Sequence, residues 1–337
     1  MILNSIKFVA ILVVLYVVSA FLLMRVNLGS TTLMKLSTRN PVTPGEFGFT
    51  VERFRDIKNY DDVDILFLGS SHSYRTFDTR IYNEYGLKTF NMGTTGQTPL
   101  NGYYLLKHYF DQLKPELVIL ELYFNVMDRD GLESLYDLST NMPFYRELLE
   151  MAIAVGSPHG INEVIAKWIA SKTGSEPHIK QIEMEGEAYV PGGYVEFTTP
   201  SQYSEEGKKP VVPRKVIPLD YQLEYLEKII RFVKERNARI ILITQTVPPR
   251  LRKSVKNYNE ISETFSNIAA KYHIPYWDFN KIMPLPVPYF QDRDHLSVPG
   301  VKRFNQAVID TLFQRGLVER ASTEGPSTKG QSASIHP

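Results

Sequence analysis

Two polar segments far apart in the sequence carry side chains that could together cleave an ester. Ser71 follows an apolar run, Val63–Leu68, and a turn that begins at Gly69. A serine acts as a nucleophile when a general base can reach its hydroxyl. His295 lies near the far end of the chain, with Asp292 three residues before it. Because histidine oriented by a carboxylate is a common base near neutral pH, these residues predict a serine nucleophile, its base and the orienting group.

Each segment also has an ordinary structural explanation. Serine after a strand and a glycine often only caps the next helix, and Asp-x-x-His can be a loop histidine beside solvated acids. Asp294 adjoins His295, and we expect its side chain to point elsewhere, with an exchange of roles with Asp292 as the alternative. A metal site would need several converging ligands, for which Asp292, Asp294 and His295 are local candidates, and we expect none.

Regular alternation of apolar runs and amphipathic segments supplies the elements that must position these groups. Continuous apolar runs predict buried parallel strands, and apolar residues at helical spacing predict helices between them. The pattern therefore predicts an α/β domain, whose ligands bind at the carboxyl edge of the sheet. The expected strands are 63–68, 87–91, 117–122, 239–244 and 274–278, and the expected helices 100–113, 218–236, 257–272 and 298–314.

Two further strand ends could supply donors for a developing oxyanion. The segment 91–98 places Gly96 among small hydroxyl residues, where a backbone N–H can approach a ligand. Asn125 follows the run 117–122 and could donate a side-chain N–H. A strand-to-helix connection and a turn residue are the plainer interpretations. Glu121 lies inside a buried run and must have partners, so we expect it behind the site.

The N-terminal segment predicts a membrane anchor. Residues 8–24 are uncharged and long enough to cross a bilayer as a helix. We expect residues 1–27 to form an uncleaved anchor at the cell membrane, with the domain extracytoplasmic, while a cleaved signal peptide is the competing interpretation. The 38 Lys and Arg balance 37 Asp and Glu, so charge gives no indication of a nucleic-acid partner. Absence of cysteine excludes disulfides and thiolate metal sites.

The domain boundaries follow from where the alternation begins, breaks and ends. We expect a linker at 28–62, a domain at 63–320 and a small, polar, disordered tail at 321–337. Within the domain, residues 126–213 or thereabouts interrupt the alternation of strands and helices. We interpret them as an insertion that covers or borders the site. The alternative for this insertion is a solvated loop region without a role.

Two motifs in the first half of the chain resemble those of the SGNH hydrolase (GDSL-like) superfamily. Gly69-Ser70-Ser71 matches the family's Gly-Asp-Ser after its first strand, which places the nucleophile at Ser71. Ser70 replaces the family's aspartate there. Segment 91–98 resembles the second block, with Gly96 at the position of the oxyanion glycine.

The remaining two motifs follow in the same order. Of the third block, Gly-x-Asn-Asp, only Asn125 remains, and its glycine is lost. The last, Asp-x-x-His, is matched by Asp292 and His295, and Leu-Ser-x-x-Gly follows it as Leu296, Ser297 and Gly300. A Gly-Ser-Ser first block is similar to the membrane-anchored acyl-transfer branches, including the D-alanyl-transfer protein of teichoic acid synthesis.

The resemblance implies a three-layer α/β/α fold with a mostly parallel sheet (SGNH/flavodoxin-like) and a mechanism without a cofactor. It implies that Ser71 attacks an ester carbonyl while His295, oriented by Asp292, takes the proton. The backbone N–H groups of Ser71 and Gly96, with the Asn125 amide, would hold the oxyanion.

Family and anchor together indicate the substrate class. The acyl-serine would pass to water or to a sugar hydroxyl, so we expect an esterase or O-acyltransferase acting on envelope or exported polysaccharide. Expected partners are an acylated or acyl-accepting glycan and a multi-pass membrane acyltransferase. Two alternatives remain open: a non-catalytic polysaccharide-binding or assembly protein on an SGNH scaffold, and a lipid-directed esterase.

Overall fold

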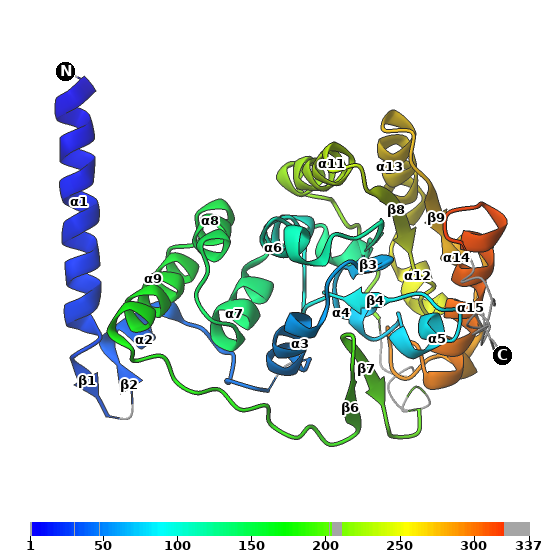
Figure 1. The fold of residues 1–337 in the computed structure, drawn as a ribbon, viewed down its shortest axis with the longest axis horizontal. Coiled ribbons are helices and arrows are strands. Elements are labelled where there is room, and N and C mark those ends of the chain that lie inside the picture. Colours follow the sequence, from blue (N-terminus) through cyan, green and yellow to red (C-terminus); the bar gives the residue numbers. More distant parts are fainter. Residues whose placement is uncertain (1, 30, 47, 202, 204–210, 320–337) are drawn as a thin grey trace, which may run out of the picture.

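A parallel sheet forms the centre of the computed structural model, which describes residues 2–29, 31–46, 48–201, 203 and 211–319 (Figure 1). Its strand order is β4-β3-β5-β8-β9, and each neighbouring pair is parallel. The expected tail at 321–337 lies outside the described residues. The strands are β3 (Ile65–Leu68), β4 (Thr89–Asn91), β5 (Leu117–Glu121), β8 (Arg239–Thr244) and β9 (Tyr276–Asp278).

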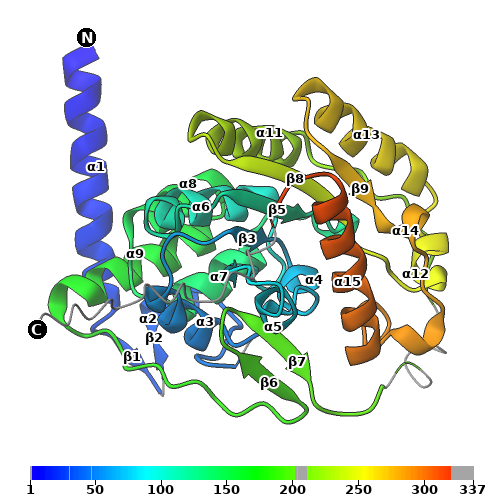
Figure 2. The ribbon, with the colours of Figure 1, turned by 45° about the vertical axis from the view of Figure 1, so that its right-hand side comes forward.

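Helices cover both faces of this sheet (Figures 1 and 2). Alternate side chains of β3 enter opposite layers: Leu66 and Leu68 pack on one side, Ile65 and Phe67 on the other. Because both faces are covered, the strands are apolar throughout, and the expected three-layer α/β/α fold is confirmed. The first layer contains α6 (Pro99–Leu113), α11 (Asp220–Glu235) and α13 (Tyr258–Lys271); the second contains α5 (Thr79–Asn83), α14 (Phe279–Ile282) and α15 (Val298–Gln314).

The strand order places the predicted motifs at one edge. From β3 the chain passes outward to β4 and then returns to the other side of β3 as β5. In open α/β sheets ligands bind at such a reversal, outside the carboxyl ends of the strands. The segments after β3, β4 and β5 all leave the sheet there, and α4 (Ser71–Tyr74) and η2 (Phe124–Val126) follow β3 and β5.

The insertion at 126–213 has two unlike parts. A helical part consists of α7 (Leu132–Asn141), α8 (Arg146–Val155) and α9 (Pro158–Thr173). A hairpin follows, β6 (Glu187–Val190) and β7 (Tyr194–Phe197), which the sequence did not predict. The hairpin turn touches the sheet, since the N–H of Asn91 donates to the carbonyl of Gly192 at 2.7 Å. A solvated loop therefore does not describe this part of the insertion.

The N-terminal helix α1 (Ile2–Leu23) extends away from the domain (Figures 1 and 2). The span Asn4–Leu23 has a mean hydropathy of 2.7, and only 6% of it is buried against the rest of the protein. It is long and apolar enough to cross a membrane, although a signal sequence has the same properties. At its foot, Ala20 packs with Met34 and Ile169. The foot is followed by β1 (Asn27–Leu28), β2 (Thr31–Thr32) and α2 (Leu33–Thr38).

The segment 28–62, expected to be a linker, is instead part of the folded domain. It contains α3 (Thr50–Asp56) and η1 (Ile57–Asn59). Arg53 on α3 is fully buried and donates from Nε to the carbonyl of Gly193 at 3.1 Å, so this segment holds the turn of the β6–β7 hairpin. The elements α12 (Pro249–Ser254) and η3 (Val287–Tyr289) complete the described structure.

Packing of α15 on the sheet should dominate the stability of the second layer. Phe304 is fully buried, with its ring 4.7 Å from Phe279 and 5.9 Å from Phe77 between centroids. We expect Phe304→Ala to lower the free energy of unfolding by about 3–5 kcal/mol, because it leaves a cavity in the core. Denaturant unfolding of the full chain would measure it. Exposed Lys302 on the same helix is the control, and an equal loss in Lys302→Ala would contradict this account.

Candidate active site

The turn after β3 presents Ser71 at the carboxyl edge of the sheet. Gly69 has φ +146°, and a Cβ there would lie 2.8 Å from the Cβ of Glu121, so only glycine fits. Ser70 then caps α4, accepting the N–H of His72 at 3.3 Å. Ser71 is the first residue of α4, so its own N–H has no intrahelical acceptor. Its hydroxyl and its N–H are therefore displayed together.

The structure brings Ser71, His295 and Asp292 into one hydrogen-bonded chain. His295 Nε2 lies 3.0 Å from Ser71 Oγ, within hydrogen-bond reach, across 224 positions of sequence. His295 Nδ1 lies 2.9 Å from Asp292 Oδ2. A proton on Nδ1 donated to this carboxylate would leave Nε2 as the acceptor for the serine hydroxyl, which is the tautomer that general-base catalysis requires.

Asp292 also shapes the loop that carries the histidine. Its Oδ1 accepts the backbone N–H groups of Asp294 at 2.9 Å and His295 at 2.7 Å. The loop is closed at its base, where the N–H of Gln291 donates to the carbonyl of His295 at 2.9 Å. One carboxylate thus fixes both the backbone and the ring.

A second carboxylate faces the same imidazole. Asp294 Oδ1 lies 3.2 Å from His295 Nδ1. Burial alone would lower the pKa of His295, but the charges of Asp294 and Asp292 outweigh burial and raise this pKa above its usual value. Burial would raise the pKa of Asp292, but the charge and hydrogen bond of His295 hold that pKa well below its usual value. For Asp294, burial and the charge of Asp292 raise the pKa.

Glu121, at the end of β5, supports the serine turn from behind. Its Oε2 accepts the N–H of Ser70 at 3.3 Å and the Ser70 hydroxyl at 3.1 Å. The side chain is buried, and burial raises its pKa to about 8. Oε1 has no partner within the described residues. Near neutral pH a proton on this carboxyl group keeps the buried site behind Ser70 uncharged.

The stacked rings of His72 and Tyr123 lie beside the His295 imidazole. His72 is fully buried, and its ring stacks on Tyr123 with centroids 3.7 Å apart. Gln245, directly after β8, hydrogen-bonds to His72 Nδ1. Burial and then the charge of His295 hold the pKa of His72 well below its usual value, so His72 is a neutral neighbour of the base. Sequence reasoning missed Tyr123 and Gln245, although both directly follow strands at the ligand-binding edge.

Gly96 and Asn125 are placed less directly than expected. The loop of Gly96 is tied to the serine turn, since Gln97 Oε1 accepts the N–H of Gly69 at 3.0 Å. The N–H of Gly96 has no hydrogen bond among the described residues, which leaves it available to a ligand. Asn125, in contrast, donates to the Tyr123 hydroxyl at 2.7 Å and accepts from Arg214 at 2.8 Å. The Asn125 amide thus uses its oxygen and one of its two N–H donors, and it makes no hydrogen bond to Ser71 among the described residues.

The β6–β7 hairpin borders the site, as one interpretation of the insertion predicted. Phe197 at the end of β7 has its ring 6.1 Å from that of His295, between centroids. The guanidinium of Arg75, four residues after Ser71, lies 4.4 Å from the centre of the Phe197 ring and pairs with Glu187 at 2.7 Å. The hairpin is therefore fixed to the helix that carries the serine.

One group of side chains here could approach a metal ion. His72, Asp294 and His295 each place a ligand atom within 4.8 Å of the others. Both ring nitrogens of His295 are already close to Ser71 and Asp292, at hydrogen-bond lengths. A metal bound there would take the base away from the serine, so the arrangement fits acyl transfer better than metal chemistry.

No protein-family model and no curated protein matches this chain. Solved structures do: a GDSL-like lipase from Bacteroides thetaiotaomicron is 12% identical and covers 79% of this chain and 98% of its own, with a TM-score of 0.40. A mutant of an acetyl-xylooligosaccharide esterase from Geobacillus is 16% identical over 79% of this chain and 99% of its own, with a TM-score of 0.38. A lipase/acylhydrolase from Enterococcus faecalis is 15% identical over 77% and 98%, with a TM-score of 0.40.

The motifs behind the SGNH resemblance can be placed on the described fold. The four motifs of the SGNH resemblance occur in order after β3, β4, β5 and β9. The similarity to the teichoic acid branch stays a prediction.

The protonation of His295 gives a direct test of its two carboxylate neighbours. We expect Asp294→Asn to lower the pKa of His295, because the substitution removes a negative charge 3.2 Å from Nδ1. Titration of the ring nitrogens by NMR in the full chain would measure this pKa. Exposed Asp111 provides the control substitution Asp111→Asn. An unchanged or higher pKa in Asp294→Asn would contradict the assigned role of Asp294.

Proposed function

We propose that this chain is a membrane-anchored, SGNH-type serine O-acyltransferase or esterase that acts on cell-envelope or exported polysaccharide through an acyl-serine intermediate. The observation that carries the proposal is the continuous chain from Asp292 through His295 to the Ser71 hydroxyl, with both contacts at hydrogen-bond length. No other group is needed to activate the serine.

The mechanism follows from this geometry. Ser71 Oγ attacks the carbonyl carbon of an ester while His295 Nε2 takes the hydroxyl proton, and Asp292 stabilises the imidazolium. His295 returns the proton to the leaving alcohol, which leaves the acyl group on Ser71. Water or a sugar hydroxyl then attacks this ester, again giving its proton to His295, and a free acid or a new ester is released.

Stabilisation of the oxyanion rests on fewer groups than the family pattern implies. The N–H groups of Ser71 and Gly96 remain available, whereas the Asn125 amide is bound by Tyr123 and Arg214. Loss of one oxyanion donor typically costs about 10²–10³ in rate. A slow transferase with a tightly held acceptor is compatible with such a site.

The exposed, apolar helix α1 supports anchoring at the membrane, and the proposal has the domain outside the cytoplasm. A tethered domain can act on a polymer held at the same surface and can receive an acyl group from a multi-pass membrane acyltransferase. A non-catalytic polysaccharide-binding protein remains the second candidate, which the engaged Asn125 favours. A lipid-directed esterase is a further outcome of the tests below.

Removal of the nucleophile separates these candidates. Loss of a triad serine costs on the order of 10⁶ in kcat in a serine hydrolase. We therefore expect Ser71→Ala to reduce cleavage of a chromogenic acetyl ester by the detergent-solubilised full chain by several orders of magnitude, up to about 10⁶-fold. Ser266→Ala, on the exposed face of α13, is the control.

Two results would argue against the proposal. Equal turnover by wild type and Ser71→Ala would remove the serine from the mechanism. Turnover by neither protein, even with oligosaccharide acceptors and long-chain esters, would favour the binding protein. Mass analysis of the acceptor distinguishes transfer from hydrolysis.

The pH dependence of this turnover tests Glu121. The rate should rise as His295 loses its proton, above the usual histidine pKa, because only the neutral ring accepts the serine proton. Above about pH 8 Glu121 ionises, and a negative charge behind Ser70 opposes the developing oxyanion. Wild type should therefore lose rate in the alkaline range.

The Glu121→Gln variant keeps an oxygen acceptor for Ser70 but stays neutral. We expect it to keep the acid limb and to lose the alkaline decline. Initial rates from pH 5 to 10 on both proteins would show this difference. Superimposable alkaline limbs would mean that Glu121 does not control them.

A further inference from the structure

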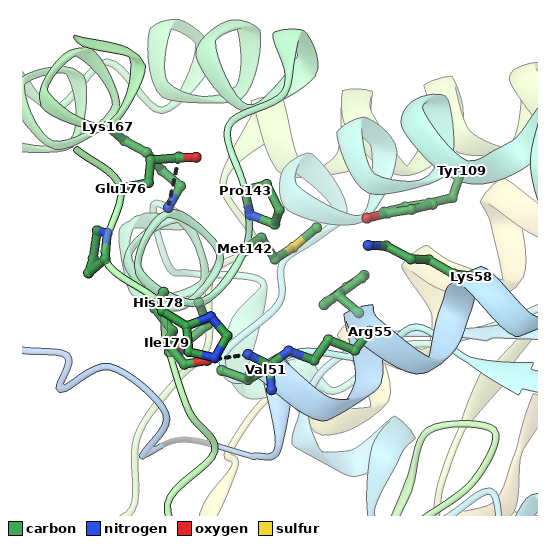
Figure 3. A pocket seen from close by; sticks show the side chains of 13 residues that line it. Val51, Arg55, Lys58, Tyr109, Met142, Pro143, Lys167, Glu176, His178 and Ile179 are labelled. Carbon is green, nitrogen blue, oxygen red and sulfur yellow. Dashed lines mark hydrogen bonds and ion pairs between the residues drawn. The ribbon is translucent and has the colours of Figure 1, made fainter. Parts of the chain in front are cut away.

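Two neighbouring cavities share a wall at Lys167 on α9, away from the serine turn. The first, of about 240 Å³, is bordered by α3, η1, α6, α9 and the segment 176–179 (Figure 3). The second, of about 660 Å³, lies at the foot of α1, next to Met24 and Met34. Both cavities are lined by Lys167, Glu176 and Pro177, so they adjoin at these residues.

The ammonium group of Lys167 lacks a close partner. Its side chain is only 10% exposed, and its ion pair with Glu176 spans 3.9 Å, which is longer than a hydrogen bond (Figure 3). Burial accordingly lowers the pKa of Lys167. A buried ammonium without hydrogen bonds is costly, and an anion in the cavity would relieve that cost.

Other donors line the first cavity. The Lys58 ammonium and the Tyr109 hydroxyl have no hydrogen-bond or ionic partner among the described residues, and both line the cavity (Figure 3). Arg55 donates to the carbonyl of Ile179 and lies 3.7 Å from Glu52. Arg55, Lys58 and Lys167 thus line this cavity with one carboxylate, that of Glu176. Glu163 also lies near Lys167 and Arg55 pairs with Glu52, so Lys58 is the unbalanced charge. The excess positive charge favours an anionic ligand.

The second cavity combines apolar side chains near α1 with the ion pair of Lys35 and Glu163. Met24 directly follows α1, and Ala166 and Ala170 of α9 line the opposite wall. Apolar side chains of the same N-terminal region are also exposed, with Leu28 at 51% and Leu36 at 53%. With α1 across a bilayer, this region lies at the membrane surface, where an acyl chain can enter.

We propose that the two cavities together bind an anionic membrane phospholipid. Its phosphate hydrogen-bonds to Lys167, the charge of Lys58 at the other end of the first cavity attracts it, and an acyl chain lies against Met24 and Met34 (Figure 3). The phosphate gives Lys167 the short contact that Glu176 does not provide. This inference rests on the proposed membrane anchoring but is independent of the chemistry at Ser71. Lipid bound at this place would hold the domain in one orientation on the membrane.

Calorimetric titration of the detergent-solubilised full chain tests the proposal. We expect saturable binding of dioctanoyl phosphatidylglycerol. Binding should weaken by at least about tenfold in Lys167→Gln, which loses a charge-assisted hydrogen bond, and by less in Lys58→Gln, which loses a positive charge in the same cavity. Lys302→Gln, on the exposed face of α15, should bind like wild type. Thermal unfolding of each variant would check that it is folded. Lys58 is exposed, so we expect its substitution to leave the core intact.

Three probes identify what is recognised. Dioctanoylglycerol, which lacks the phosphate, and inorganic phosphate, which lacks the chains, should each bind at least about tenfold more weakly than the phospholipid. Equal binding of dioctanoylglycerol, equal binding of inorganic phosphate, or unchanged affinity in both lysine variants would overturn the proposal. Ser71→Ala should bind the lipid like wild type, so failure of lipid binding and failure of ester cleavage are read separately.

Discussion

The imidazole of His295 is held between a carboxylate and a hydroxyl, and the candidate site depends on that position. The hydroxyl belongs to the turn after β3, whereas the ring and the carboxylate belong to the loop before α15. A parallel sheet explains how they meet, because all its strands end at the same edge. Since misplacement by 1 Å can cost about 10²-fold in rate, packing that fixes Ser71 against His295 is a functional requirement.

Burial of ionisable groups around this pair gives the site its electrostatic character. Asp292 and Asp294 favour the charged imidazole, while His72 and Glu121 are held neutral by burial. Once His295 has taken a proton, its two carboxylate neighbours stabilise the resulting imidazolium. The same arrangement places negative charge near the reaction, so neutrality of Glu121 behind Ser70 matters for the oxyanion.

The sequence predicted what local pattern controls. Apolar runs predicted all of the strands of the central sheet, and Asp292 could be paired with His295 because three residues of backbone suffice to bring them together. The β6–β7 hairpin and α3 escaped prediction because distant contacts hold them, such as that of Arg53 with Gly193. The role expected of Asn125 also depends on distance, since Arg214, remote in sequence, binds its amide oxygen.

The helical insertion joins the foot of the anchor to the loop of Gly96. On α7, the Tyr136 hydroxyl donates to the carbonyl of Thr38 at 2.6 Å, next to α2. One residue later, Asp137 Oδ2 accepts the N–H of Thr95 at 3.3 Å, directly before Gly96. A single helix thus contacts both the end of α2 and the loop of Gly96. Because α7 is packed in the core on most of its surface, the orientation of α1 and the direction in which the serine site opens are mechanically linked. Under the proposed anchoring, this linkage would hold the site at a fixed angle to the membrane, which suits a substrate held at that surface better than a freely diffusing one.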